Sequence, residues 1–267
     1  MRVVALLTCK DEARFLGGCI DHLVAHGVEV HVTDDGSTDE TADIARARLG
    51  EGVIAVERAD GGDDTFRLRR QLARKEELAQ TLGADWYLHL DPDEIRLPPR
   101  ADQRLVDAFA AAEDDGANAV EFLEFLFLPT QEAPDHDHPR FLETMRSYHP
   151  FRPRPHHRLN AWRQPAGGVD LIGHGGHEVV FPDRRVHPVP FRMRHYLFLS
   201  RDHARRKYGR RQFDPDEVAL GWHGWRSRLE DVRLPAAAEL RDYVGDDALD
   251  PSAPWGHADL ERTVVQR

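Results

Sequence analysis

The first third of the chain alternates between short apolar runs and amphipathic segments. Apolar or alternating runs typical of strands occupy residues 3–9, 28–34, 52–57 and 85–95. Apolar residues at helical spacing predict helices over 12–27, 37–50 and 65–82, and Ser37 with Glu40 forms a capping box for the second of them. Strands that alternate with helices in this way predict an α/β fold with a mostly parallel central sheet and helices on both faces.

The pattern becomes less regular after Pro98. We expect a helix over 101–114, a strand over 118–128, a long loop over 129–158, strands over 168–181 and 190–199, and a helix over 200–211. The remaining residues, 212–267, include a Trp-rich stretch and an acidic tail. We therefore predict a domain over 1–211, whose halves are 1–100 and 101–211, followed by a helical extension and tail over 212–267.

Carboxylates gather where the predicted parallel strands end. Asp34 and Asp35 close one strand, and Asp91, Asp93 and Glu94 close another, in "DWYLHLDPDEI". Ligands bind at the carboxyl ends of the strands in such sheets. Two carboxylates one residue apart on a turn can share a hard divalent cation such as Mg²⁺ or Mn²⁺, and the cation would offset their mutual repulsion. The sequence therefore predicts a metal–diphosphate site at this edge.

Charge and composition argue against several classes of protein. The 267 residues carry 36 Lys and Arg against 47 Asp and Glu, a net charge of −11, which argues against a general nucleic-acid binder. Two cysteines cannot build a disulfide framework, and no apolar run is long enough for a signal peptide core or an integral membrane segment. We expect a cytoplasmic protein.

Three stretches together resemble a known family. "TCKDEARFL" (8–16), "TDDGSTDET" (33–41) and "DWYLHLDPDEI" (85–95) are similar to the nucleotide-sugar half of family 2 glycosyltransferases, which have the GT-A fold. A weaker resemblance to the acceptor half of a bacterial subgroup extends over "GGHEVVF" (175–181) and "RHYLFLSRDHARRKY" (194–208). Asp11 departs from the family, which often has Asn there, but Asp can still accept a hydrogen bond from a base.

The resemblance implies a role for each matching residue on the donor side. The nucleotide base would lie near Thr8, Asp11 and Glu12. The base and ribose would be held by Asp34 and Asp35, and the nucleotide would be reached by Arg70 or Arg74. The ribose or sugar would contact Asp91, and the diphosphate would contact Lys207 or Arg206.

The resemblance also implies the metal ligands and the catalytic groups. Asp93 would bind the metal with Asp91, and members of this fold often supply one more ligand, for which His195 is the candidate. An inverting transferase also needs a base that deprotonates the acceptor hydroxyl. Glu178 and His177, in the glycine-rich "GHGGHEVV", are the alternatives.

These residues predict a metal-dependent glycosyltransferase that moves a sugar from a nucleotide-diphosphate sugar to an acceptor hydroxyl, with inversion. We expect a UDP-sugar donor, Mn²⁺ or Mg²⁺, and a saccharide or small-molecule acceptor. The alternatives are a nucleotidyltransferase, which would usually carry a Gly-rich basic loop after the first strand, and a non-catalytic nucleotide-sugar-binding protein of the same fold. A more distant alternative is a metal-dependent hydrolase built on the histidines of 135–139 and 156–157.

Overall fold

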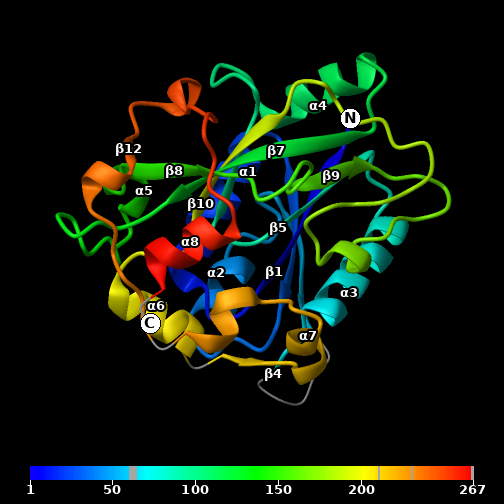
Figure 1. The fold of residues 1–267 in the computed structure, drawn as a ribbon. Coiled ribbons are helices and arrows are strands. Elements are labelled where there is room, and N and C mark those ends of the chain that lie inside the picture. The colour runs from blue at the N-terminus through cyan, green and yellow to red at the C-terminus, as the bar shows by residue number, and fades with distance from the viewer. Residues whose placement is uncertain (60–64, 210, 230, 266–267) are drawn as a thin grey trace. The chain divides into compact units, whose positions relative to one another are not determined.

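The computed structural model describes residues 1–59, 65–209, 211–229 and 231–265. The chain divides into two compact units (Figure 1). The first unit contains residues 1–62, 68–122 and 156–193, and the second contains 63–67, 123–155 and 194–267. The chain passes from one unit to the other inside strands β7 (Ala119–Phe127) and β10 (Phe191–Tyr196). The domain boundaries at 100 and 211 stay predictions.

The first unit holds the alternating strands and helices of the N-terminal third. Besides the first residues of β7 and β10, its elements are β1 (Val3–Cys9), α1 (Ala13–Ala25), β2 (Glu29–Asp34), α2 (Thr41–Arg46), β3 (Val53–Arg58), α3 (Leu68–Thr81), β5 (Trp86–Leu90), β6 (Glu94–Leu97), α4 (Leu105–Asp114), β9 (Leu159–Arg163) and η1 (Ile172–His174).

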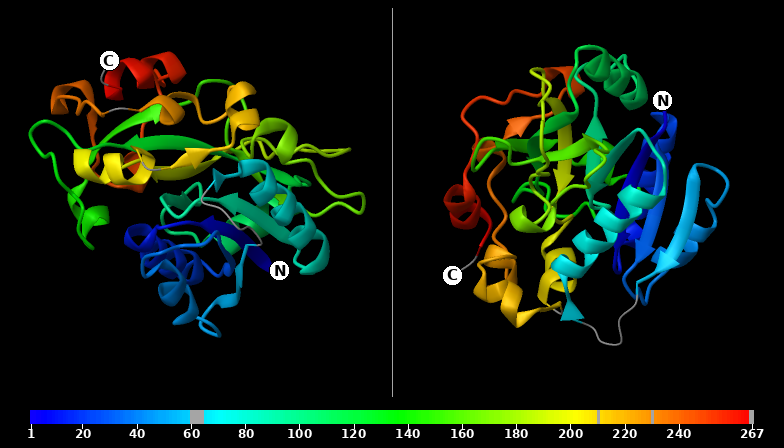
Figure 2. Two further views of the ribbon diagram at one scale, coloured as in Figure 1. Left: turned by 90° about the horizontal axis from the view of Figure 1, so that it is seen from below. Right: turned by 90° about the vertical axis from the view of Figure 1, so that its right-hand side faces the viewer.

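The sheet of this unit has the strand order β7-β9-β5-β1-β2-β3. Strands β5, β1, β2 and β3 are parallel, whereas β9 is antiparallel to both β5 and β7. The chain moves outward from β1 through β2 to β3 and then returns to the other side of β1 as β5. Right-handed crossovers place α1 and α2 on one face and α3, the cyan helix of Figure 2, on the other. The predicted α/β class with a mostly parallel sheet is confirmed.

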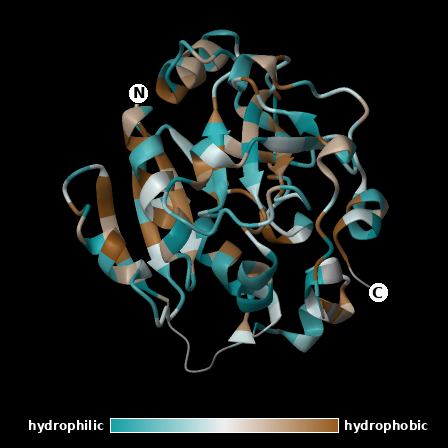
Figure 3. Cartoon of the chain, turned by 90° about the vertical axis from the view of Figure 1, so that its left-hand side faces the viewer, coloured by the Kyte–Doolittle hydropathy of each residue, from teal (hydrophilic) through white to brown (hydrophobic). Residues whose placement is uncertain are grey.

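Burial explains why these strands form. All seven residues of β1 and all five of β5 are buried, which is typical of strands covered by helices on both faces. The strands near the N-terminus are largely brown in the hydropathy view of Figure 3. Leu72 and Leu78 of α3 pack with Val4, Leu6 and Tyr87 in one apolar cluster.

The second unit is built of shorter elements. Besides the last residues of β7 and β10, these are β4 (Thr65–Phe66), α5 (Phe141–Thr144), β8 (Ser147–Phe151), α6 (Arg201–Gly209), β11 (Gln212–Phe213), α7 (Pro215–Ala219), η2 (Gly224–Arg228), η3 (Ala237–Glu239), β12 (Arg241–Asp242), η4 (Asp246–Ala248) and α8 (His257–Val264). Strand β8 is antiparallel to β7 and β12, and β4 pairs with β11. The core includes Leu126, Phe198, Tyr208 and Val264.

Three predicted elements differ from the structure: one helix is shorter than expected, and two other segments have a different structure. The helix expected over 37–50 is α2, which begins only at Thr41, because the Ser37 hydroxyl accepts from the Asp11 N–H group instead of capping a helix. The strand expected over 168–181 is a turn around η1 with isolated bridges, since Gly175 and Gly176 have positive φ. The loop expected over 129–158 contains α5 and β8, whose alternate residues Tyr148 and Pro150 are buried.

Candidate functional site

The parallel registers bring three acidic strand ends to one edge of the first unit. Cys9 is paired with Asp34 between β1 and β2, and Leu7 is paired with Leu90 between β1 and β5. Thr8, Asp34 and Asp91 therefore lie at nearly the same level along parallel strands. This edge lies where β5 returns beside β1, which is where open α/β sheets bind ligands.

The loops after β1 and β2 are tied to one another by side chains. The Asp11 backbone N–H donates to the Ser37 hydroxyl (3.0 Å), and the Asp11 carboxylate accepts from the Thr38 N–H (2.7 Å). Asp34 is buried and accepts from the Ser37 N–H (3.1 Å), and the N–H of the buried Glu12 donates to the Thr41 hydroxyl (2.8 Å). These bonds hold the predicted base-binding residues in one shaped loop pair.

Helix α3 provides the cation beside Asp35. The Asp35 carboxylate is buried, lies 2.6 Å from the Arg70 guanidinium and accepts from the Gln71 amide (2.9 Å). Arg74, one helical turn further on, is committed to Glu57 (2.8 Å) and Glu77 (3.0 Å). Of the two arginines predicted to reach the nucleotide, Arg70 therefore lies at the acidic edge.

The three carboxylates of the Asp91–Glu94 turn lie in different environments. Asp91 is exposed, whereas Asp93 is buried. Glu94 is only 2% exposed and its carboxylate accepts from the Asp91 N–H group (3.2 Å). The same carboxylate lies 2.5 Å from the Arg96 guanidinium and 3.5 Å from that of Arg158. Glu94 thus closes the turn and lies against its own counterions.

Sequence reasoning missed a buried pair beneath this turn. The Lys75 ammonium donates to Nδ1 of His89 (2.7 Å) and to the Leu90 carbonyl (3.2 Å). Burial lowers the pKa of Lys75 to about 8, although Asp91 and Glu94 oppose the shift. Burial and the Lys75 charge hold the pKa of His89 well below its usual range. A signal existed, because Lys75 stands three residues from both Leu72 and Leu78 on the apolar stripe of α3.

The two candidate bases have different partners. Glu178 is paired with the Arg184 guanidinium (2.9 Å), and its other carboxylate oxygen lies 4.0 Å from His174 Nδ1. His177 Nδ1 lies 3.1 Å from the Arg158 guanidinium. A guanidinium can only donate, so His177 Nδ1 is the acceptor and the proton of a neutral ring lies on Nε2. Glu178 is therefore the stronger candidate base.

The remaining predicted residues belong to the second unit. His195 is buried, and its Nδ1 lies 2.6 Å from a Glu124 carboxylate oxygen. Lys207 is half-buried on α6, with its ammonium 5.9 Å from the Tyr208 ring, and Arg206 is paired with Asp137.

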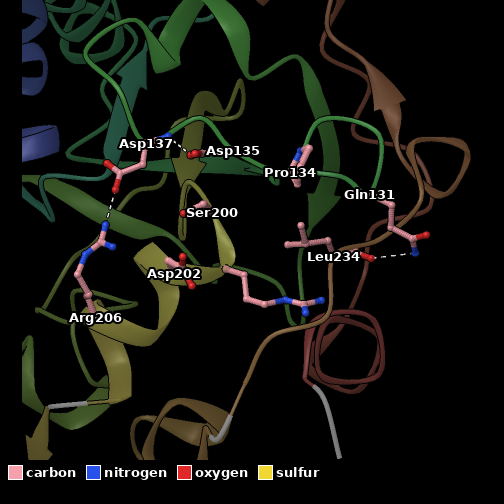
Figure 4. Close-up of a pocket in the computed structure, with 9 residues that line it drawn as sticks. Gln131, Pro134, Asp135, Asp137, Ser200, Asp202, Arg206 and Leu234 are labelled. Atoms are coloured by element: carbon pink, nitrogen blue, oxygen red, sulfur yellow. Dashed lines mark hydrogen bonds and ion pairs between the residues drawn. The ribbon is translucent and has the colours of Figure 1, made fainter.

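The second unit also carries an open cavity of about 610 Å³ (Figure 4). It is lined by Gln131, Pro134, Asp135, Asp137, Ser200, Arg201, Asp202, Arg206 and Leu234. Asp137 and Arg206 are paired, as Figure 4 shows, and Asp202 pairs with Arg205. The lining thus combines carboxylates, guanidinium groups, an amide and a hydroxyl.

No group of three or more His, Cys, Asp or Glu side chains in the described part of the chain is placed to hold a metal ion. This includes the histidines of 135–139 and 156–157, where His136 is bonded instead to the Thr144 hydroxyl (3.0 Å). The Asp91 and Asp93 pair still fits Mg²⁺ or Mn²⁺, because hard cations in phosphate-transfer sites usually take one or two carboxylates and complete their coordination with water and substrate phosphates. Among the described residues, no helix is both long and apolar enough to cross a membrane.

Comparison with known proteins adds a family match. Residues 5–122 match the model of "Glycosyl transferase family 2". The match spans β1 to Phe122 and includes every predicted donor-side residue except Lys207 and Arg206. No curated protein matches the chain.

Several solved structures are distantly similar. S. aureus TarS in complex with UDP is 15% identical, with a TM-score of 0.35 over 49% of this chain and 36% of that one. The mannosyltransferase PcManGT from Pyrobaculum calidifontis, in complex with GDP-Man and Mn²⁺, is 21% identical, with a TM-score of 0.34 over 46% and 35%. Glucosyl-3-phosphoglycerate synthase from Mycobacterium tuberculosis, with Mg²⁺ and UDP, is 20% identical, with a TM-score of 0.31 over 46% and 43%. The chain spans less than half of each.

Proposed function

Because residues 5–122 match the model of glycosyl transferase family 2, we propose that the chain belongs to this family and transfers a sugar from a nucleotide-diphosphate sugar to an acceptor hydroxyl group. The observation that carries the proposal is the convergence of Thr8, Asp34 and Asp91 on one sheet edge within the family segment. An acidic edge needs positive charge to hold an anionic donor, and Arg70 lies there beside Asp35.

The donor-side roles follow from where each residue lies. The tied loops that carry Thr8, Asp11 and Glu12 would form the wall of the base pocket. Asp34 would accept from the nucleoside, and Asp35 would be oriented by Arg70 and Gln71. The contact of Lys207 with the diphosphate stays a prediction. A UDP-sugar is the proposed donor.

We assign the metal to Asp91 and Asp93. When bound, Mn²⁺ or Mg²⁺ would act as a Lewis acid that stabilises the charge developing on the departing diphosphate. Glu94 holds the Asp91 N–H group and so fixes the turn from which both carboxylates project. The role of His195 as a further ligand stays a prediction.

We propose that Glu178 is the catalytic base. Its carboxylate takes the proton of the acceptor hydroxyl, the acceptor oxygen forms its bond to the anomeric carbon, and the bond to the nucleoside diphosphate breaks on the opposite face of the sugar. This sequence inverts the anomeric configuration. The ion pair with Arg184 orients the Glu178 carboxylate before the reaction. The acceptor would be a saccharide or a hydroxyl-bearing small molecule.

A thermal-shift experiment tests the proposed function. The protein is melted with UDP, GDP and dTDP, each in Mn²⁺ and in EDTA, and with Mn²⁺ alone. A ligand that binds the folded state raises its melting temperature. Because the protein supplies two carboxylates and the diphosphate would supply further oxygens, we expect one nucleotide with Mn²⁺ to give a larger shift than the two separate shifts added together.

The proposal is wrong if none of the three nucleotides changes the melting temperature in Mn²⁺. An equal shift of the melting temperature in Mn²⁺ and in EDTA would instead show that the protein binds the nucleotide without a metal ion.

A further inference from the structure

A buried charged cluster lies behind the Asp91–Glu94 turn, and of its members only Glu94 has a part in the proposed function. Its members are Glu94, Arg96 and Arg158, and they contact His177 and Phe122. Arg96 is fully buried, donates to the Glu94 carboxylate (2.5 Å) and the His89 carbonyl (3.1 Å), and stacks over the Phe122 ring at 4.5 Å. These contacts alone supply one full positive charge for the Glu94 carboxylate.

Arg158 brings a second guanidinium to the same carboxylate. Its side chain is 11% exposed and its NH1 atom lies 3.5 Å from Glu94. Burying a second cation is costly, and neutralising Glu94 does not require it. The same NH1 atom lies 3.1 Å from His177 Nδ1. Arg158 therefore bridges the proposed metal turn and the segment that carries His177 and Glu178.

Two further contacts hold that segment in place. The His177 ring stacks on the His157 ring with centroids 4.6 Å apart. Gly176 has φ +78°, and a Cβ atom there would lie 2.6 Å from His89 Nε2. The backbone of Gly176 therefore approaches His89, which stands two residues before Asp91, more closely than any other residue would allow.

We propose that Arg158 is a positioning residue that sets the segment 174–178 against the Asp91–Glu94 turn. This inference rests on the proposed function, because that function assigns metal binding to the Asp91–Glu94 turn and the catalytic base to the segment 174–178. One guanidinium contacts both the carboxylate that closes the metal turn and the imidazole next to Glu178. The distance between the base and the metal-binding carboxylates then depends on one side chain.

The test compares Arg158→Met, Arg158→Lys and Gly176→Ala with the wild type. A control is Arg163→Met, because Arg163 ends β9, the strand that directly follows Arg158, but pairs with Glu113 in a half-exposed ion pair. Sugar transfer is measured as kcat and KM, and UDP, GDP and dTDP binding is measured by melting in Mn²⁺ and in EDTA. We expect Arg158→Met to lower kcat about 10- to 100-fold and to weaken the Mn²⁺-dependent nucleotide shift.

The conservative variant separates positioning from folding. Lysine keeps the charge beside Glu94 but lacks the planar fork, so Arg158→Lys should recover part of kcat. Gly176→Ala should lower kcat without removing any charge, and Arg163→Met should leave kcat and the nucleotide shift at wild-type values. The inference is overturned if folded Arg158→Met keeps wild-type kcat and shift while only its melting temperature falls. If the wild type itself shows no nucleotide shift, the proposed function fails instead.

Discussion

At the scale of single residues, the carboxylates of the acidic edge fall into two groups. Glu94 and Asp35 form the first group, because each lies within 2.6 Å of a guanidinium group and the ion pair holds its side chain in place. Asp91 is exposed at the turn, and Asp93 lies two residues further on. Close carboxylates repel one another, and a bound cation would relieve that repulsion. Glu94, which the sequence alone left without a role, closes the turn from inside.

Lys75 gives a prediction about stability. Its folded pKa is about 8, against an ordinary value of 10.5. Below about pH 8 both the folded and the unfolded chain keep Lys75 protonated, so the contribution of Lys75 to the free energy of unfolding does not change with pH. Between about pH 8 and 10.5 only the unfolded chain holds it, so the stability due to Lys75 rises with pH, by up to about 1.4 kcal/mol per unit.

Denaturant unfolding of the wild type and Lys75→Met at pH 7 and pH 10 checks this. The free energy of unfolding of the wild type minus that of Lys75→Met should be larger at pH 10. A difference that is constant or falls with pH would show that the folded protein keeps Lys75 charged.

At the scale of elements, the sequence predicted the strands and helices that have a clear hydrophobic periodicity. Strands β1, β2, β3 and β5 and helices α1 and α3 were predicted to within a few residues, because buried runs and amphipathic stripes are strong signals. The shared edge of Asp34 and Asp91 followed from the strand order. Periodicity does not predict contacts between distant segments. The turn around Gly175 and Gly176 and the bridging role of Arg158 depend on such contacts, so the sequence did not predict them.

Helix α3 offers a matched pair of arginines one turn apart. Arg70→Met removes the cation beside Asp35 and should weaken nucleotide binding about tenfold, since hydrogen bonds to charged groups contribute roughly 1.5–3 kcal/mol. Arg74→Met removes half-exposed ion pairs with Glu57 and Glu77, which should cost at most about 1 kcal/mol of stability and leave nucleotide affinity unchanged. Titration of both variants with UDP, GDP and dTDP in Mn²⁺ separates the two roles. Equal losses of affinity would contradict the placement of Arg70 at the site.

At the scale of the whole molecule, the family match and the two compact units do not coincide. Residues 5–122 provide most of the first unit, but Glu178, His177 and β9 follow the match and still fold into that unit. The second unit, with its polar cavity, lies almost wholly outside the matched residues. Its short elements and Pro- and His-rich segments gave little periodicity, which explains why its structure was predicted least well. The GT-A class was predicted from the part of the chain that the family covers.

Asp93 is proposed to belong to a metal-dependent nucleotide site. Calorimetric titration of UDP, GDP and dTDP into the wild type, Asp93→Asn and Asp114→Asn, each in Mn²⁺ and in EDTA, tests it most directly. Asp114 lies exposed at the end of α4 and serves as the control. We predict that Mn²⁺ tightens the binding of one nucleotide to the wild type and to Asp114→Asn, and that Asp93→Asn loses this gain while its affinity in EDTA is unchanged. An Asp93→Asn variant that keeps the full Mn²⁺-dependent gain would show that Asp93 does not bind the metal.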